Sequence, residues 1–529
     1  MFRMPSMRLS ARSIQITGAI AAIWLFAIVL YCYRDVSFST PTLNTTHGST
    51  RPNNQALESI ELGARYLADY PLKDEPKEIF GELGQRTQLL RSWIDELEVY
   101  TKAPTDGSRR ATKLVTNTIE SLYPYLKSDG RLAPPLADIY ERLGLPYKPT
   151  SISQNKKAPA GIVIPTGDKT LRFACHLIAS LTRVHKTTLP IQVVYAGDDD
   201  LSADGQKKIQ EAANGVKIEM LDVLTVFDDS TLKLASGGWA IKPFAALASR
   251  YQQAIVLDAD AVFFQAPEKL LQQERFQETG VLLFHDRLLW KNAFADRQDW
   301  WHDQIKHPSP ETDKSLVWTE RYAEEGDSGI VVVDKSRLDV LLGLLHIGWQ
   351  NSDRVRNEVT YKLTYGDKES WWIGFEATGS KYSFSPHYGG IVGWLGPTKA
   401  ETEAAKKEEE EKKKKEQDAE EKKDKRGDKR ENEEVRVCSF VIAHVDQDDK
   451  LLWYNGGLLK NKAVNQTEFE VPTHWMIDQK WHKGRSKKDM SCMAGTQANE
   501  LESAEKDILA KSIEVAKDMD AKLGLIPSA

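Results

Sequence analysis

Two aspartates, Asp258 and Asp260, stand one residue apart between the apolar runs Ile255–Leu257 and Ala261–Phe264. Burying an aspartate is costly unless its carboxylate is paired or binds a metal. On a strand, residues i and i+2 point to the same face, so both carboxylates can reach one ligand. Oxygen donors suit Mg²⁺ or Mn²⁺, which commonly take one or two carboxylates and fill the other positions with substrate phosphates. The spacing therefore predicts a divalent-cation site. The alternative is an ordinary turn with a capping aspartate.

Alternating strands and helices must position this pair. Apolar patterning predicts, in chain order, a strand at 161–165, a helix at 171–185, a strand at 191–196, a helix at 202–214, a strand at 216–221, a helix at 242–250 and a strand at 253–257. This order is typical of an open, largely parallel sheet with right-handed crossovers. Ligands of such sheets bind beyond the carboxyl ends of the strands. Thr166-Gly167, Gly197-Asp198 and the aspartate pair all fall there.

The rest of the chain can be divided by composition and periodicity. Residues 56–150 carry apolar side chains at helical spacing and predict a small helical subdomain. Residues 158–494 contain the strand-helix series and predict the catalytic domain, with further strands at 280–284, 329–333, 437–444 and 451–454 and a helix at 337–349. Residues 399–434 are almost entirely charged, so we expect a solvated insertion that loops out and is a candidate contact surface for protein partners. Residues 495–529 predict a polar C-terminal helix.

The N-terminal segment predicts a membrane anchor. Residues 16–33 contain no charged side chain, and as a helix they would be about 27 Å long, enough for a thin bilayer. Residues 1–15 carry arginines and no acid, which predicts a short cytoplasmic tail. Residues 34–55 are rich in Ser, Thr, Pro and Asn and predict a stem. We expect a type II membrane protein of the early secretory pathway; the alternative is a cleaved signal peptide.

The net charge and the cysteine count limit the possible partners and the possible disulfides. The net charge of −6 over 529 residues argues against a general electrostatic grip on nucleic acid. Three of the four cysteines follow the predicted anchor (Cys175, Cys438 and Cys492), so at most one internal disulfide forms and its connectivity stays open.

Several sequence blocks in a fixed order resemble fungal α-1,3-mannosyltransferases of the Mnn-one type, which are Golgi nucleotide-sugar glycosyltransferases of the GT-A architecture. The resemblance extends over about residues 160–460. It is carried by Gly161-Ile162-Val163-Ile164-Pro165-Thr166-Gly167, Trp239-Ala240-Ile241-Lys242-Pro243-Phe244, Leu257-Asp258-Ala259-Asp260, Phe284-His285-Asp286-Arg287, Asp327-Ser328-Gly329, Gly366-Asp367-Lys368-Glu369 and Leu452-Trp453-Tyr454-Asn455-Gly456-Gly457 with His444. It implies a GT-A-like open sheet flanked by helices.

The resemblance implies a role for the residues that would bind the metal and the phosphates. Asp258 and Asp260 would bind Mn²⁺ (or Mg²⁺), and His444, at the end of a predicted strand over 439–443, would be the third ligand. Lys242 would contact the donor phosphate or the neighbouring carboxylates. The alternative for His444 is a satisfied polar residue, and for Lys242 a solvated surface lysine.

The resemblance also implies a nucleotide side of the site. Thr166, Gly167 and Arg172 would lie along the nucleotide, since glycine allows close approach of a ligand to the backbone. Gly456 and Gly457 offer backbone N–H groups that can bind phosphate. The alternative for this pair is a hairpin turn.

On the acceptor side, Asp367 and Asp327 are the candidate catalytic residues. A carboxylate such as Asp367 can accept the proton of the acceptor hydroxyl or orient sugar hydroxyls; the alternative is that Asp367 caps the helix starting near Lys368. We favour front-face attack, with retention of configuration and deprotonation assisted by the leaving diphosphate. A covalent glycosyl-enzyme on Asp367 or Asp327 stays open.

The sequence thus predicts a Golgi membrane α-1,3-mannosyltransferase that moves mannose from GDP-mannose to a mannose-containing glycan on glycoproteins. One rival is a GT-A transferase that uses a UDP-sugar. Another is a catalytically silent scaffolding relative.

Overall fold

The computed structural model describes residues 54–128, 131–147, 158–397, 435–486 and 488–526. The predicted tail (1–15), anchor (16–33), nearly all of the stem (34–55) and the charged insertion (399–434) lie outside the described residues. Within the described part of the chain, no helix is both long and apolar enough to cross a membrane.

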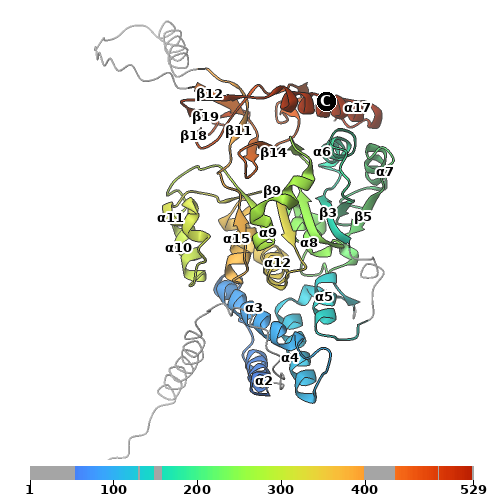
Figure 1. The fold of residues 1–529 in the computed structure, drawn as a ribbon, viewed down its shortest axis with the longest axis vertical. Helices are drawn as coiled ribbons and strands as arrows, with labels where there is room; N and C mark the ends of the chain where they lie inside the picture. Colours follow the sequence, from blue (N-terminus) through green and yellow to red (C-terminus); the bar gives the residue numbers. More distant parts are fainter. Residues whose placement is uncertain (1–53, 129–130, 148–157, 398–434, 487, 527–529) are drawn as a thin grey trace, which may run out of the picture. The chain divides into compact units, whose positions relative to one another are not determined.

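A seven-stranded sheet lies at the centre of the described residues (Figure 1), in the order β10-β8-β9-β6-β3-β4-β5. Its strands are β3 (Ala158–Pro165), β4 (Ile191–Tyr195), β5 (Ile218–Asp222), β6 (Tyr251–Leu257), β8 (Val281–His285), β9 (Gly326–Asp334) and β10 (Ser383–Phe384). β9 is antiparallel to both of its neighbours, and the other neighbours pair in parallel. This confirms the predicted α/β fold with a largely parallel central sheet. From β3 the sheet extends through β4 to one side and through β6 to the other, so the carboxyl ends of β3 and β6 flank a ligand crevice.

Helices cover both faces of this sheet because its strands are apolar on both faces. Val163 and Val256 belong to the core shared with α8 (Ile241–Ala248) and α12 (Leu338–Gln350). Their neighbours Ile162 and Ile255 belong to the core on the other face, with α6 (Leu171–Ala179) and α7 (Ala203–Ala212). Figure 1 shows the two pairs of helices on opposite sides of the strands. The predicted helix 171–185 is an α-helix only to Ala179 and continues as a π-helical turn, Ser180–Val184.

Helices before the sheet share its core. They are α2 (Asn54–Asp69), α3 (Pro76–Glu98), α4 (Asp106–Leu122) and α5 (Pro134–Arg142). α3 packs on α12 and on α15 (Lys368–Ala377). A Cβ atom on Gly84 would lie 2.5 Å from the carbonyl oxygen of Ala377, so only glycine allows α3 to come this close to α15. The helices of 54–142 and the sheet thus form one packed unit. Along the chain, α9 (Glu274–Thr279) precedes β8, and α10 (Ala295–Gln304) and α11 (Leu316–Glu320) follow between β8 and β9.

Two smaller sheets are built from strands that follow β6 in the chain. The three-stranded sheet is β13 (Ile442–Val445), β14 (Leu451–Asn455) and β7 (Ala261–Phe263). The six-stranded sheet is, in order, β18 (Lys480–His482), β19 (Ser491–Gly495), β12 (Val435–Ser439), β11 (Ile391–Leu395), β17 (His474–Met476) and β20 (Asn499–Glu500). A disulfide between Cys438 and Cys492 joins β12 to β19, and Cys175 is a buried free thiol. One internal disulfide is the maximum that the sequence allows among these three cysteines.

The predicted strand 439–443 is wrong in one respect. β12 ends at Ser439 and β13 begins at Ile442, because the chain crosses there from the six-stranded to the three-stranded sheet. His444 therefore lies inside β13 and not at the end of a strand. The hairpin β15 (Leu459–Asn461) and β16 (Asn465–Phe469) follows β14, and α17 (Ser503–Leu523) packs on α6.

Candidate active site

The aspartate pair lies where the chain passes from one sheet to another. The amide of Asp258 donates to the carbonyl of Gly329 on β9 (2.8 Å), and the amide of Ala261 donates back to the carbonyl of Asp258 (3.1 Å). After this turn β7 pairs with β14. The turn exists as the alternative interpretation requires, but the carboxylates do not cap it. Asp258 forms an ion pair with Lys242, and Asp260 forms one with Lys462.

Lys242 on α8 connects three elements around the pair. Its ammonium lies 2.8 Å from Asp258 Oδ1 and 3.4 Å from Asp367 Oδ1, and it donates to the carbonyl and the hydroxyl of Ser328 on β9. Lys242 is 4% exposed, so it is not the solvated surface lysine of the alternative interpretation. It fixes the ends of β6, β9 and α15 around one point.

Negative charge at this point exceeds what Lys242 offsets. Burial, together with the charges of Asp260 and Asp367, raises the pKa of Asp258 to about 7 against the pull of Lys242. Burial alone would lower the pKa of Lys242, but Asp258 and Asp367 hold it above its usual value. Carboxylate oxygens that repel one another fit a divalent cation, which would relieve the repulsion. Asp258 and Asp260 are the pair whose chemistry fits that role.

Asp327 on β9 has three hydrogen-bond donors. Its Oδ1 accepts from the amide of Gly329 (3.0 Å) and from Asn455 Nδ2 (2.9 Å), and its Oδ2 accepts from His444 Nε2 (3.1 Å). Burial would raise the pKa of Asp327, but the His444 hydrogen bond and the Lys368 charge hold it well below its usual range. A Cβ atom on Gly329 would lie 2.6 Å from Asn455 Nδ2, so glycine is needed there for the Asn455 contact. Asp327 is therefore an ionised, firmly positioned carboxylate.

His444 contacts Asp327 through its Nε2. Its ring stacks on Trp453 with centroids 4.3 Å apart and meets the edge of Phe284, and its residue exposure is 3%. Among the described residues, no three His, Cys, Asp or Glu side chains are grouped as they would be around a metal ion. The third-ligand role of His444 stays a prediction.

Asp367 stands at the N-cap position of α15, but its side chain does not cap the helix. Its Oδ2 accepts from Trp371 Nε1 (2.9 Å), while Oδ1 faces Lys242. The capping alternative therefore does not describe this side chain. Glu369, two residues later, is fully buried and accepts from the amides of Glu325 and Gly326, so it supports the start of β9.

A cavity of about 1100 Å³ opens over these carboxylates. It gathers predicted residues from both sides of the site: Thr166, Gly167, Lys242, Asp258, Asp260, Asp327, Asp367 and Gly456. Three predicted residues do not line it, namely Arg172, Gly457 and His444. The nucleotide-side and acceptor-side candidates thus share one cavity, at the sheet edge where the strand order places a ligand.

Arg172 binds residues outside the cavity. Its guanidinium donates two bonds to Asp520 on α17 (2.9 and 2.6 Å) and two to Gln466 on β16. His176 lies 2.7 Å from the same Asp520 carboxylate. All three members of this ionic group are buried. The arginine anchors the C-terminal helix on α6 and does not reach the cavity.

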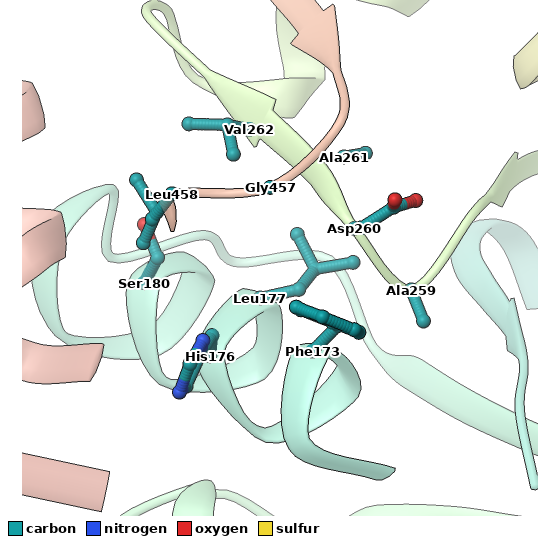
Figure 2. A pocket seen from close by; sticks show the side chains of 10 residues that line it. All are labelled: Phe173, His176, Leu177, Ser180, Ala259, Asp260, Ala261, Val262, Gly457 and Leu458. Atoms are coloured by element: carbon teal, nitrogen blue, oxygen red, sulfur yellow. The ribbon is translucent and has the colours of Figure 1, made fainter. Parts of the chain in front are cut away.

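Gly456 and Gly457 hold the backbone of the aspartate turn. Their amides both donate to the carbonyl of Asp260 (3.3 and 2.8 Å), so neither N–H is directed at a phosphate here. Figure 2 shows the segment of Gly457 and Leu458 crossing the strand that carries Asp260, Ala261 and Val262. This is not a hairpin turn either, because β14 pairs with β7 and β13 while β15 pairs with β16.

Sequence reasoning did not assign several cavity residues, among them Lys462, Lys368, Trp239 and Tyr365. Lys462, in the β15–β16 hairpin, pairs with Asp260, and Lys368 lies 2.5 Å from the buried Asp286. The exposed rings of Trp239 and Tyr365 pack on each other with centroids 5.2 Å apart. Lys368 stands between two acids in the sequence, which is a usable signal. Nothing in the sequence relates Lys462 to Asp260, 202 positions away.

Comparison with known proteins places these features in a family context. Residues 159–446, about half of the chain, match the protein family described as "Mannosyltransferase putative". The α-1,3-mannosyltransferase MNT3 of Saccharomyces cerevisiae is 28% identical over 309 residues, which is 54% of this chain and 44% of the relative. The α-1,3-mannosyltransferase MNN1 of the same yeast is 27% identical over 350 residues, 57% of this chain and 41% of the relative. The chain therefore spans about half the length, or less, of these curated relatives.

Solved structures give only distant similarity. The mannosyltransferase Ktr4p of S. cerevisiae in complex with GDP has a TM-score of 0.30 and 10% identity, with 61% of this chain and 82% of that one covered. Core-mannan synthase A of Aspergillus fumigatus in an Mn/GDP form has a TM-score of 0.29 and 12% identity, with 45% and 74% covered. These scores are too low to carry an argument about the fold, which rests on the strand order described above.

Proposed function

The chain belongs to the mannosyltransferase family, and from this premise we propose that it moves mannose from GDP-mannose to a mannose-containing glycan on glycoproteins. The observation that supports this most is that Asp258, Asp260, Asp327 and Asp367 line a single cavity, in which Lys242 bridges Asp258 and Asp367. A cavity of about 1100 Å³ is large enough for a nucleotide-sugar and an acceptor sugar together. The α-1,3-mannosyltransferases among the curated relatives support an α-1,3 linkage with retention.

Asp258 and Asp260 would bind the divalent cation, Mn²⁺ or Mg²⁺, with His444 as the proposed third ligand. Such a cation supplies positive charge against the diphosphate leaving group. Thr166 and Gly167, at the end of β3, would lie along the nucleotide.

The remaining residues position the acceptor and hold charge. Asp367 orients the acceptor hydroxyl, whose oxygen bonds to the anomeric carbon of mannose while the bond from that carbon to the diphosphate breaks. The hydroxyl proton passes to the leaving diphosphate. Asp327 is a poor nucleophile because three donors occupy its oxygens, so we assign it the positioning of His444 and Asn455. Lys242 holds the carboxylates of Asp258 and Asp367 in fixed positions relative to each other during the reaction.

We further propose a Golgi membrane location with the catalytic domain in the lumen, anchored by residues 16–33. The disulfide between Cys438 and Cys492 supports an oxidising compartment.

A donor panel with the purified chain tests the proposal. GDP-mannose should be turned over in the presence of Mn²⁺ and UDP-glucose should not. Asp258→Asn and Asp260→Asn should each lower kcat/KM at least about 100-fold, whereas Asp204→Asn, at an exposed position on α7, should not change it. Turnover of UDP-glucose in place of GDP-mannose would assign the site to a UDP-sugar transferase. Full activity in both aspartate variants would refute the metal-dependent mechanism.

A further inference from the structure

The cavity has a second chemical character where loops other than the aspartate turn line it. This part of the wall is formed by the loop after β8, with Arg287 and Trp290, and by the loop between β18 and β19, with Lys483 and Arg485. Lys368, next to Asp367 in the sequence, connects the wall to the catalytic carboxylates. We call these five residues the cationic wall.

Positive charge on the cationic wall is not balanced by nearby acids. Asp286 is the buried partner of both Lys368 (2.5 Å) and Arg287 (3.1 Å). Within the described residues, Lys483 and Arg485 have no carboxylate within ion-pair distance. Asp489, the acid on their own loop, accepts instead from the hydroxyl of Ser486 (2.9 Å). Lys483 and Arg485 therefore line the cavity without an ion-pair partner among the described residues, although Asp489 lines it too.

The environment of Lys483 agrees with this imbalance. The residue as a whole is exposed, but its ammonium is partly desolvated inside the cavity, and desolvation together with the Arg287 charge lowers its pKa. Asp286 and Glu324 act in the opposite direction and do not cancel the shift. A bound anion would offset the repulsion between these cations.

An aromatic ring stands in the same wall. Trp290 is 52% exposed, and with Trp239 it is one of the two described tryptophans that are largely exposed; both line this one cavity. A flat ring at the edge of a polar cavity can pack against the face of a sugar. The wall thus combines a surface for a sugar with charges for an anion.

We propose that the cationic wall is a subsite for a phosphate group carried by the acceptor glycan, with Trp290 against the sugar and Lys483 and Arg485 on the phosphate. The proposal rests on the proposed function for the identity of the acceptor. The same chemistry could serve the donor diphosphate, but that group is expected at Asp258 and Asp260, whose ion pairs go to Lys242 and Lys462 and not to the cationic wall. Lys368 would lie between the two ends of this acceptor, with the reacting hydroxyl at Asp367 and the phosphate at the cationic wall.

Paired acceptors test the subsite. The full chain would be assayed with methyl α-mannobioside and with the same disaccharide carrying a 6-phosphate on its non-reducing mannose and on its reducing mannose in turn. At least one phosphorylated form should have a KM about 10-fold lower than the neutral one, and this preference should shrink as NaCl is raised. The double variant K483Q/R485Q should bring the ratio close to 1. Lys488→Gln, an exposed lysine on the same loop that does not line the cavity, should keep the wild-type ratio.

The results separate the sources of the phosphate. If K483Q/R485Q raises the KM for GDP-mannose and leaves the acceptor ratio unchanged, the wall serves the donor and the proposal is overturned. Calorimetric titration of the phosphorylated disaccharides into the chain without donor gives a readout that does not need turnover. Binding that is lost in the double variant and kept in Lys488→Gln supports the subsite even if GDP-mannose is not the donor. Absence of binding together with equal KM values refutes it.

Discussion

At the scale of single residues, Lys242 determines whether the site holds together. It is buried, and it is the cation shared by Asp258 and Asp367, which come from different elements. Removing one member of a buried ionic group leaves the others uncompensated, which costs more than the group contributes when intact. Its role is therefore structural and electrostatic at once.

Lys242→Met should lower the free energy of unfolding by about 3–5 kcal/mol, as expected for a broken buried ion pair. Without the ammonium, the pKa of Asp258, which burial already raises, rises further in the folded state. A carboxylate whose pKa is raised in the folded state lowers the free energy of unfolding as pH rises. The destabilisation caused by Lys242→Met should therefore be larger at pH 8 than at pH 5.5. Urea denaturation at the two pH values measures this. Lys217→Met, at an exposed lysine, should stay within about 0.5 kcal/mol of wild type; a cost below about 1 kcal/mol for Lys242→Met would contradict the buried network.

Residue types alone did not distinguish ligand contacts from structural ion pairs. Arg172 follows β3 closely and looks like a nucleotide contact, yet its partner is Asp520, 348 positions later. His444 meets Asp327 over 117 positions. Such pairings depend on how α17 and the small sheets dock, which local periodicity does not encode. Asp258, Thr166 and Gly167 could be placed because strand ends of a parallel sheet meet at one edge.

At the scale of elements, the apolar runs predicted the strands of the central sheet well, but they predicted the junctions between sheets poorly. The runs at 161–165 and 253–257 are apolar on both faces, which is the signature of a buried parallel strand, and they became β3 and β6. The region around 439–445 is one apolar run in the sequence but two strands in different sheets. Composition stays apolar across that crossing, so only tertiary pairing reveals it.

The docking of α17 depends on one carboxylate. Asp520→Ala should lower the free energy of unfolding by about 3–5 kcal/mol, because Arg172 and His176 then remain buried without their partner. Hydrogen exchange should increase along α17 and change little in β3. Asp518→Ala is the matched control on the same helix. Its carboxylate pairs with Arg183 and Lys522 at the surface, where an ion pair contributes about 1 kcal/mol or less. Equal effects of the two substitutions would show that the buried group does not anchor the helix.

At the scale of the whole molecule, the N-terminal helices and the sheet share one core, and His346 lies at their junction. It is fully buried on α12, its Nε2–H donates to the carbonyl of Phe80 on α3 (3.2 Å), and Nδ1 accepts from Gln350 Nε2 (3.1 Å). This pattern requires the neutral ring, since both nitrogens already have the partners that a neutral imidazole can use. Protonation would place a charge in the interface between α3 and α12.

Burial lowers the pKa of His346 to about 4, below the 6.5 expected for the unfolded chain. The unfolded state therefore binds more protons between pH 6.5 and 4, and stability falls as pH falls through that window. The shift corresponds to about 3 kcal/mol at its full extent. His346→Gln, which keeps an amide donor for the Phe80 carbonyl, should remove this part of the acid sensitivity, whereas His307→Gln, at an exposed histidine, should not. The free energy of unfolding measured from pH 7 to 4 decides between them. If both variants lose stability as steeply as wild type, the acid response arises outside the α3–α12 junction. If only His346→Gln flattens the curve, the N-terminal helices are coupled to the catalytic sheet through this contact, because a charge at their junction destabilises the shared core as a whole.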